Sequence, residues 1–139
     1  MAKHCETFDH TADVGLAARA DTLGELFEAL AEGLADLICA REQVAPAQQR
    51  AVSVQAEDLE ALAVDFLSAV RAVMQTGRFV VASVSVNKID EGAVEAKLLG
   101  EPYDPNQHEL ATEVKAVTYH QLKITREGGA WVGRVILDV

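Results

Sequence analysis

Residues 22–39 read TLGELFEALAEGLADLIC, and their spacing predicts one helix that organises the rest of the chain. The apolar side chains recur at intervals of three and four residues, which places them on one helical face: Leu23, Leu26, Phe27, Leu30, Leu34, Leu37 and Ile38. Thr22 is an N-cap candidate, with Glu25 at the third position of a capping box. The intervening acids are expected to face solvent: Glu25, Glu28, Glu32 and Asp36. The pattern therefore predicts an amphipathic helix packed on a core.

A second helix is predicted from Asp58, as N-cap, through Met74, with Gly77 as its stop signal. Its apolar face comprises Leu59, Leu62, Ala63, Phe66, Leu67, Val70 and Met74. Asp65 falls beside this face, at a boundary position.

Elsewhere the apolar residues alternate with a period of two, which is typical of strands. The predicted strands are Cys5–Asp9, Val14–Ala20, Ala51–Glu57, Phe79–Ile89, Ala93–Leu99, Val114–Thr125 and Ala130–Val139. A connector at 43–49 and a polar loop at 100–112 join these elements. We therefore expect an α+β fold, with two amphipathic helices packed on a mixed, mostly antiparallel β-sheet, in a single domain over 1–139.

The charge is strongly negative and unevenly distributed. The formal net charge is −10. Residues 1–70 carry 13 acidic and 4 basic side chains, whereas residues 71–139 carry 9 and 8. Because such a surface repels phosphates, no strong direct binding to nucleic acid is expected. A contribution to solubility is the simpler explanation of the acidic excess, and docking on a basic protein partner is the more specific alternative.

The expected location is the cytoplasm. Cys5 and Cys39 form no metal-binding or CxxC spacing, so we expect reduced thiols rather than a disulfide. The N-terminal sequence MAKHCETFDHTAD lacks the apolar core of a signal peptide. No run of 18 apolar residues exists, so no membrane association is expected.

Two acidic positions stand out at opposite ends of the sequence. Asp13 follows a strand in FDHTADVGL, and Asp138 sits between Leu137 and Val139 near a second anion, the terminal α-carboxylate. The simple alternative is that both anions near residue 138 are hydrated. If the end of the chain instead docks near Asp13, the converging oxygens suit a hard cation such as Ca²⁺ or Mg²⁺.

A second set of polar residues lies in and after the 100–112 loop: Glu101, Asp104, His108, Lys115 and His120. With a metal, His10, His108 or His120 could serve as general base of a hydrolase. However, the sequence has no ordered nucleophile–base set, phosphate loop or HExxH motif. His120 also fits a structural histidine, and Lys115 a solvated lysine at a strand edge.

These positions together resemble the archease family. The matching segments are HTAD at 10–13, LAVDFLSAV in the second helix, GEPYD at 100–104 with His108, VKAVTYH at 114–120 and VILDV at 135–139. The resemblance implies a divalent cation held by Asp13, Asp138 and Val139, with Ca²⁺ expected first and Mg²⁺ or Mn²⁺ as alternatives. His10, Glu101, Asp104, His108, Lys115 and His120 become candidates for partner contact.

The resemblance further implies a protein cofactor, without enzymatic activity of its own, for the RNA-splicing ligase of tRNA splicing and RNA repair. Such a factor promotes guanylylation and multiple turnover of the ligase. Two other hypotheses remain: a stand-alone divalent-metal-dependent phosphohydrolase, and a chaperone-like modulator of tRNA-modifying enzymes.

Overall fold

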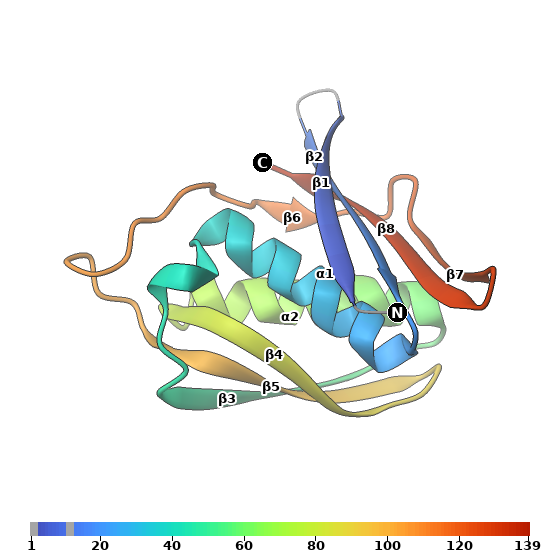
Figure 1. Ribbon diagram of the computed structural model, residues 1–139, viewed down its shortest axis with the longest axis horizontal. Helices are drawn as coiled ribbons and strands as arrows, with labels where there is room; N and C mark the ends of the chain where they lie inside the picture. Colours follow the sequence, from blue (N-terminus) through green and yellow to red (C-terminus); the bar gives the residue numbers. More distant parts are fainter. Residues whose placement is uncertain (1–2, 11–12) are drawn as a thin grey trace.

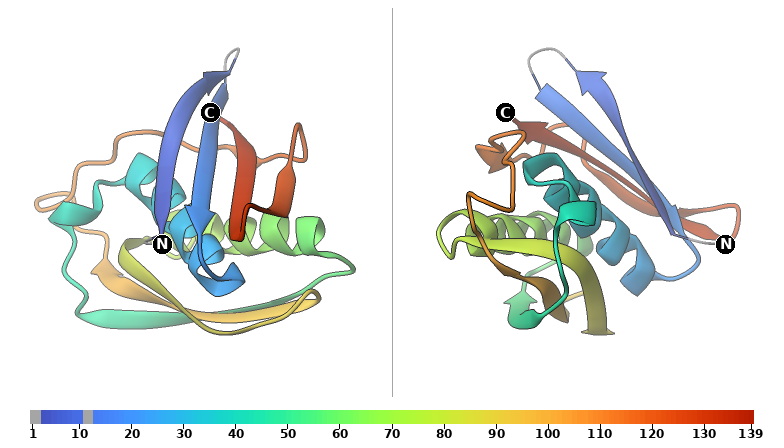
Figure 2. Two further views of the ribbon diagram at one scale, coloured as in Figure 1. Left: turned by 45° about the vertical axis from the view of Figure 1, so that its right-hand side comes forward. Right: turned by 60° about the vertical axis from the view of Figure 1, so that its left-hand side comes forward.

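The computed structural model describes residues 3–10 and 13–139, without the side chains of Asp9 and His10. Within this part of the chain, two helices lie between two antiparallel sheets, giving three layers (Figure 1). Figure 2 shows the larger sheet across the helices, on the side opposite the smaller sheet. The α+β class is confirmed, but the strands divide between two sheets rather than forming one. Both helices present apolar side chains to the core, so each sheet can cover one side of the pair.

The larger sheet has the order β1-β2-β8-β6, and β7 also pairs with β8. Its strands are β1 (His4–His10), β2 (Asp13–Ala20), β6 (Ala116–Val117), β7 (Lys123–Glu127) and β8 (Ala130–Asp138). The smaller sheet has the order β3-β5-β4. Its strands are β3 (Gln48–Gln55), β4 (Phe79–Ile89) and β5 (Ala93–Pro102). Every pairing in the two sheets is antiparallel in the described residues.

Helices α1 (Leu23–Ile38) and α2 (Leu59–Gln75) are joined through the short 3₁₀ helix η1 (Arg41–Gln43) and β3. Thr22 is confirmed as the N-cap of α1, because its hydroxyl accepts from the Glu25 N–H at 3.1 Å; the same hydroxyl donates to the Glu25 carboxylate at 3.0 Å. Asp58 caps α2 by accepting from the Ala61 N–H at 2.8 Å. No helix among the described residues is long and apolar enough to span a membrane.

Three of the predicted strands differ from the structure by more than one residue. Strand β3 begins at Gln48, inside the predicted connector, and β5 continues to Pro102. The predicted strand 114–125 is interrupted, because the chain turns at 119–122, where Gln121 has a left-handed φ of 52°. The ends of these strands depend on pairing with strands that are distant in the sequence, and the local alternation of apolar and polar residues does not reveal that pairing.

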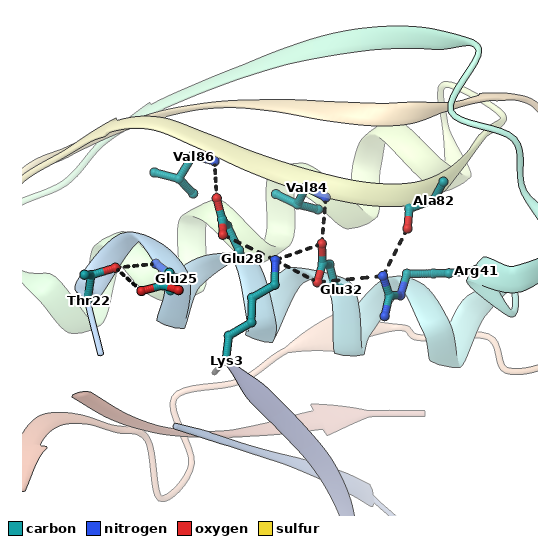
Figure 3. A network of polar contacts seen from close by, with 9 residues as sticks. All are labelled: Lys3, Thr22, Glu25, Glu28, Glu32, Arg41, Ala82, Val84 and Val86. Carbon is teal, nitrogen blue, oxygen red and sulfur yellow. Dashed lines mark hydrogen bonds and ion pairs between the residues drawn. The ribbon is translucent and has the colours of Figure 1, made fainter. Parts of the chain in front are cut away.

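The acidic face of α1 is also different from the prediction, since Glu32 is buried and Glu28 is half-buried. Their carboxylates accept hydrogen bonds from the backbone N–H groups of Val84 and Val86 on β4, at 3.0 and 2.8 Å (Figure 3). Lys3 lies within 3.3 Å of both carboxylates. The two glutamates therefore satisfy the outer edge of β4, an edge that would otherwise be free to pair with another chain.

Candidate metal and partner site

The first and last of the singled-out motifs meet at one end of the larger sheet. In the register of β2 and β8, Asp13 lies directly opposite Asp138. On the other flank of β8, Ala116 of β6 pairs with the same Asp138. The Lys115 N–H donates to the Asp138 carbonyl oxygen at 2.7 Å. Sheet pairing thus places Asp138 of LDV between Asp13 of HTAD and Ala116 of KAVTYH.

Asp13 and Asp138 lie on the outer face of this sheet. Leu16, Val135 and Leu137 are fully buried in the core between the sheets. Because side chains alternate along a strand, the aspartates project from the opposite face. Both residues are partly buried, as is Val139.

The chemistry of this donor set fits a hard cation. Carboxylates directly opposite each other on neighbouring strands lie close enough to repel, and a bridging divalent cation removes that repulsion. Among the side chains that the structure describes, which exclude those of Asp9 and His10, no three of His, Cys, Asp or Glu form a group that could hold a metal. The expected set therefore depends on two side-chain carboxylates, Asp13 and Asp138, supplemented by Val139.

Three residues that sequence reasoning missed share this outer face. The Phe8 ring covers Gly15, whose added Cβ would lie 2.0 Å from a ring carbon. The Arg134 guanidinium lies 4.0 Å from the centroid of the same ring. The alternation of Arg134, Ile136 and Asp138 in RVILD was the available signal. This stack gives the outer face a cation on β8, the strand of Asp138, and an aromatic ring on β1, which pairs with the strand of Asp13.

The segment after Lys115 is fastened to β8. The Thr118 hydroxyl and N–H both donate to the Ile136 carbonyl oxygen, at 2.9 and 3.1 Å. The Thr118 hydroxyl in turn accepts from the His120 N–H at 3.2 Å. Lys115 and His120 are exposed at the two ends of this fastened segment. Their positions beside β8 are therefore fixed by the backbone, although contact with a partner stays a prediction.

Glu101, Asp104 and His108 form a separate cluster beyond the smaller sheet. The Asp104 N–H donates to His108 Nδ1 at 2.9 Å, so the neutral ring carries its proton on Nε2 and donates to Glu101 at 2.8 Å. The Glu101 carboxylate also accepts from the Ala45 N–H at 2.9 Å. Both hydrogen bonds lower the pKa of the Glu101 carboxyl, and the bond from Ala45 has the larger effect.

This cluster closes the loop after β5 and ties it to the segment after η1. The His108 side chain is fully buried, and the Tyr103 ring lies 6.1 Å away between centroids. The structure therefore gives Glu101, Asp104 and His108 an internal role at a place apart from the acid pair. The backbone of His10 pairs with Asp13, while its side chain, with Thr11 and Ala12, lies outside the described residues.

The fold and the motif cluster define a class of small α+β proteins in which two helices separate two antiparallel sheets, and in which two aspartates face each other across paired strands with a lysine bonded to one of them through its backbone. Residues 5–139 match the model of the Archease protein family (MTH1598/TM1083). The chain belongs to the archease family.

Similar proteins span nearly the whole chain. Protein archease of Pyrococcus abyssi is 37% identical, with 99% of each chain covered. That of Thermococcus kodakarensis is 38% identical, covering 96% of this chain and 97% of its own. The solution structure of Methanobacterium thermoautotrophicum protein 1598 superposes with a TM-score of 0.80 at 32% identity, covering 97% and 98% of the two chains.

A second solved structure supports the fold alone. It is a crystal structure from Thermotoga maritima, described as an archease and possible chaperone. Its TM-score is 0.61 at 19% identity, with 96% of each chain covered.

Proposed function

We propose that this protein is a metal-binding accessory factor that activates the RNA-splicing ligase, promoting its guanylylation and multiple turnover. The observation that carries the proposal is the register that sets Asp13 opposite Asp138, with Lys115 hydrogen-bonded to the same residue. Membership of the archease family and the −10 charge agree with a factor that docks on a basic RNA-binding enzyme.

In this proposal Asp13, Asp138 and Val139 hold a divalent cation, Ca²⁺ first, with Mg²⁺ or Mn²⁺ as alternatives. The bound cation would supply positive charge that neutralises the facing carboxylates. Lys115 would add a further positive charge just before β6, where its backbone N–H is bonded to the Asp138 carbonyl oxygen. With the cation and Lys115 in place, the charges of Asp13, Asp138 and the Val139 carboxylate would be balanced, so that this part of an acidic protein would be able to approach a phosphate held in the guanylylation site of the ligase.

The test is an assay of the ligase with and without substoichiometric amounts of this protein, measuring the ligase–GMP adduct and the number of RNA ends joined per ligase. The wild-type protein should raise both quantities. Asp13→Asn and Asp138→Asn should abolish the effect, whereas Asp65→Asn, an exposed aspartate on α2, should keep it. No effect of the wild-type protein on either quantity would refute the ligase role.

Calorimetric titration with Ca²⁺ separates the metal proposal from the ligase proposal. Asp13→Asn and Asp138→Asn should lose binding, because each removes one of two acidic side-chain ligands. Lys115→Gln should keep the cation and lose activation of the ligase. If both aspartate variants bind Ca²⁺ like the wild type, the proposed ligand set is wrong.

The alternative role of a chaperone-like modulator of tRNA-modifying enzymes gives a different result in the same variants. If the protein is a chaperone that needs no metal, the Asp138→Asn variant should protect a client protein from aggregation as well as the wild type does. Turnover of a phosphorylated small molecule by the protein alone would instead support the phosphohydrolase hypothesis.

A further inference from the structure

A pocket of about 520 Å³ opens between the C-terminal ends of both helices and the segment that follows β5. Its floor is apolar, because Ile38, Met74 and Val80 are buried side chains. Arg78, Leu110 and Glu113 are exposed residues at its rim. The volume falls within the range of roughly 300–1,000 Å³ that is typical of ligand pockets.

Hydrogen bonds hold the walls of this pocket in place. The N–H groups of Ala111 and Thr112 donate to the carbonyl oxygens of Ile38 and Leu37, at 2.9 and 3.0 Å. These carbonyls belong to the last turn of α1, where helix geometry leaves them without partners. The Gln75 side chain donates to the next part of the same segment, at the Val114 carbonyl oxygen, over 3.0 Å. The pocket is therefore pre-formed, which lowers the entropic cost of binding.

Arg78 holds an unusual backbone conformation at the rim. Its φ of 51° is left-handed, a region that glycine adopts more easily than any residue with a Cβ. Gly77 directly precedes it, yet Gly77 is needed for close packing, since a Cβ there would lie 2.4 Å from the Val73 carbonyl oxygen. The Arg78 carbonyl accepts from the Tyr103 N–H at 2.8 Å, which fixes this conformation.

The Arg78 guanidinium is available to a ligand. Within the described residues it has no hydrogen-bond or ion-pair partner, and the protein around it carries a net charge of −10. Guanidinium groups bind carboxylates through two parallel hydrogen bonds. Leu110 is 54% exposed, so the same rim also presents an apolar side chain to solvent. The rim and floor together match a ligand that combines an apolar body with one carboxylate.

We propose that this pocket binds the C-terminal residue of another polypeptide, with an apolar side chain on the floor and the free α-carboxylate on Arg78. That residue carries an apolar side chain and a carboxylate on a single Cα, which are the two groups that an apolar floor and an arginine at the rim accept. Glu113 on the same rim is negatively charged and repels the carboxylate of the ligand, so it limits the affinity. The inference goes beyond the ligase role, because the pocket shares no residue with the Asp13–Asp138 pair.

The probes are two peptides, N-acetyl-Ala-Leu-Phe with a free carboxylate and the same peptide as its C-terminal amide. Titration followed by amide NMR shifts should show changes at Ala111 and Thr112 for both peptides. We expect the free acid to bind about five-fold more tightly, as one exposed, charge-assisted pair allows. Arg78→Gln should reduce the affinity for the acid to that for the amide.

Three further variants complete the test. Arg78→Gly suits a φ of 51° and so keeps the fold, yet it should also abolish the preference for the acid. Glu113→Gln should tighten binding of the acid by removing repulsion. Arg126→Gln, the same charge change on the exposed strand β7, should leave both affinities unchanged. Equal affinities of the wild-type protein for acid and amide would overturn the proposal, as would the absence of shifts at millimolar peptide.

Discussion

Removing the Glu32 carboxylate should destabilise the protein far more than removing an acidic side chain from a helix surface. In the structure the Glu32 side chain is 9% exposed, accepts from the Val84 N–H at 3.0 Å and pairs with Lys3 at 3.2 Å. Glu32→Ala leaves that N–H unsatisfied in a buried place, at a cost of about 1–3 kcal/mol, and also loses the charge-assisted bond. The higher helix propensity of alanine returns only about 0.4 kcal/mol.

We therefore expect Glu32→Ala to lower the free energy of unfolding by about 2–3 kcal/mol. Glu32→Gln keeps an oxygen for the Val84 N–H and loses mainly the ion pairs with Lys3 and Arg41. Those partners are 33% and 34% exposed, so the loss should be about 1 kcal/mol. Urea unfolding followed by circular dichroism measures each value.

Glu60→Ala, at an exposed position on α2, is the control and should change stability by less than about 0.5 kcal/mol. The reasoning is refuted if Glu32→Ala is no more destabilising than this control. Such a result would mean that β4 keeps its outer edge satisfied without α1.

The remaining predictions concern a close backbone contact and two titrating groups. Gly100→Ala should destabilise by about 1–3 kcal/mol, because its Cβ would lie 1.9 Å from a β4 carbonyl oxygen; Gly24→Ala, with 3.6 Å of clearance inside α1, should instead stabilise by about 0.5–1 kcal/mol in the same unfolding assay. Equal effects of the two changes would contradict the packing argument. Burial, followed by the Glu6 charge, raises the pKa of Cys5 to about 12, so at pH 8 its alkylation by iodoacetamide should be over about 100-fold slower in the folded than in the urea-unfolded protein, measured by mass spectrometry; similar rates would show an accessible thiolate. The lowered pKa of Glu101 stabilises the fold above the ordinary glutamate range, near pH 4.3, and this contribution disappears as the pH falls through the lowered value. The stability difference between wild type and Glu101→Gln should therefore shrink between pH 6 and pH 3, and a constant difference would exclude this titration.

The sequence predicted the parts of the fold that depend on local spacing. Thr22 and Asp58 cap their helices as expected, because an N-cap bond joins residues only three positions apart in the sequence. The class of fold follows from the same patterns. The division into two sheets did not follow, since strand alternation is the same whichever sheet a strand joins.

For the candidate site, too, the sequence predicted the local motifs but not how they meet in space. Oxygen-rich motifs at residues 10–13 and 135–139 were visible in the sequence, but nothing in their spacing showed that the two ends meet. The antiparallel register of β2 and β8 sets Asp13 opposite Asp138, and such a register depends on contacts between residues over a hundred positions apart. A cation at this pair stays a prediction.

The local pattern of apolar, polar and capping residues therefore determined where helices and strands form and which residues carry the motifs. Tertiary structure alone decided what several polar side chains do. Glu28 and Glu32 satisfy the edge of β4, and Glu101 ties the loop that contains His108 to Ala45, because each of these three glutamates accepts from a backbone N–H more than 50 residues away in the sequence. Periodicity reports only the direction in which a side chain leaves its own element, whereas burial and hydrogen bonding depend on the element packed against it.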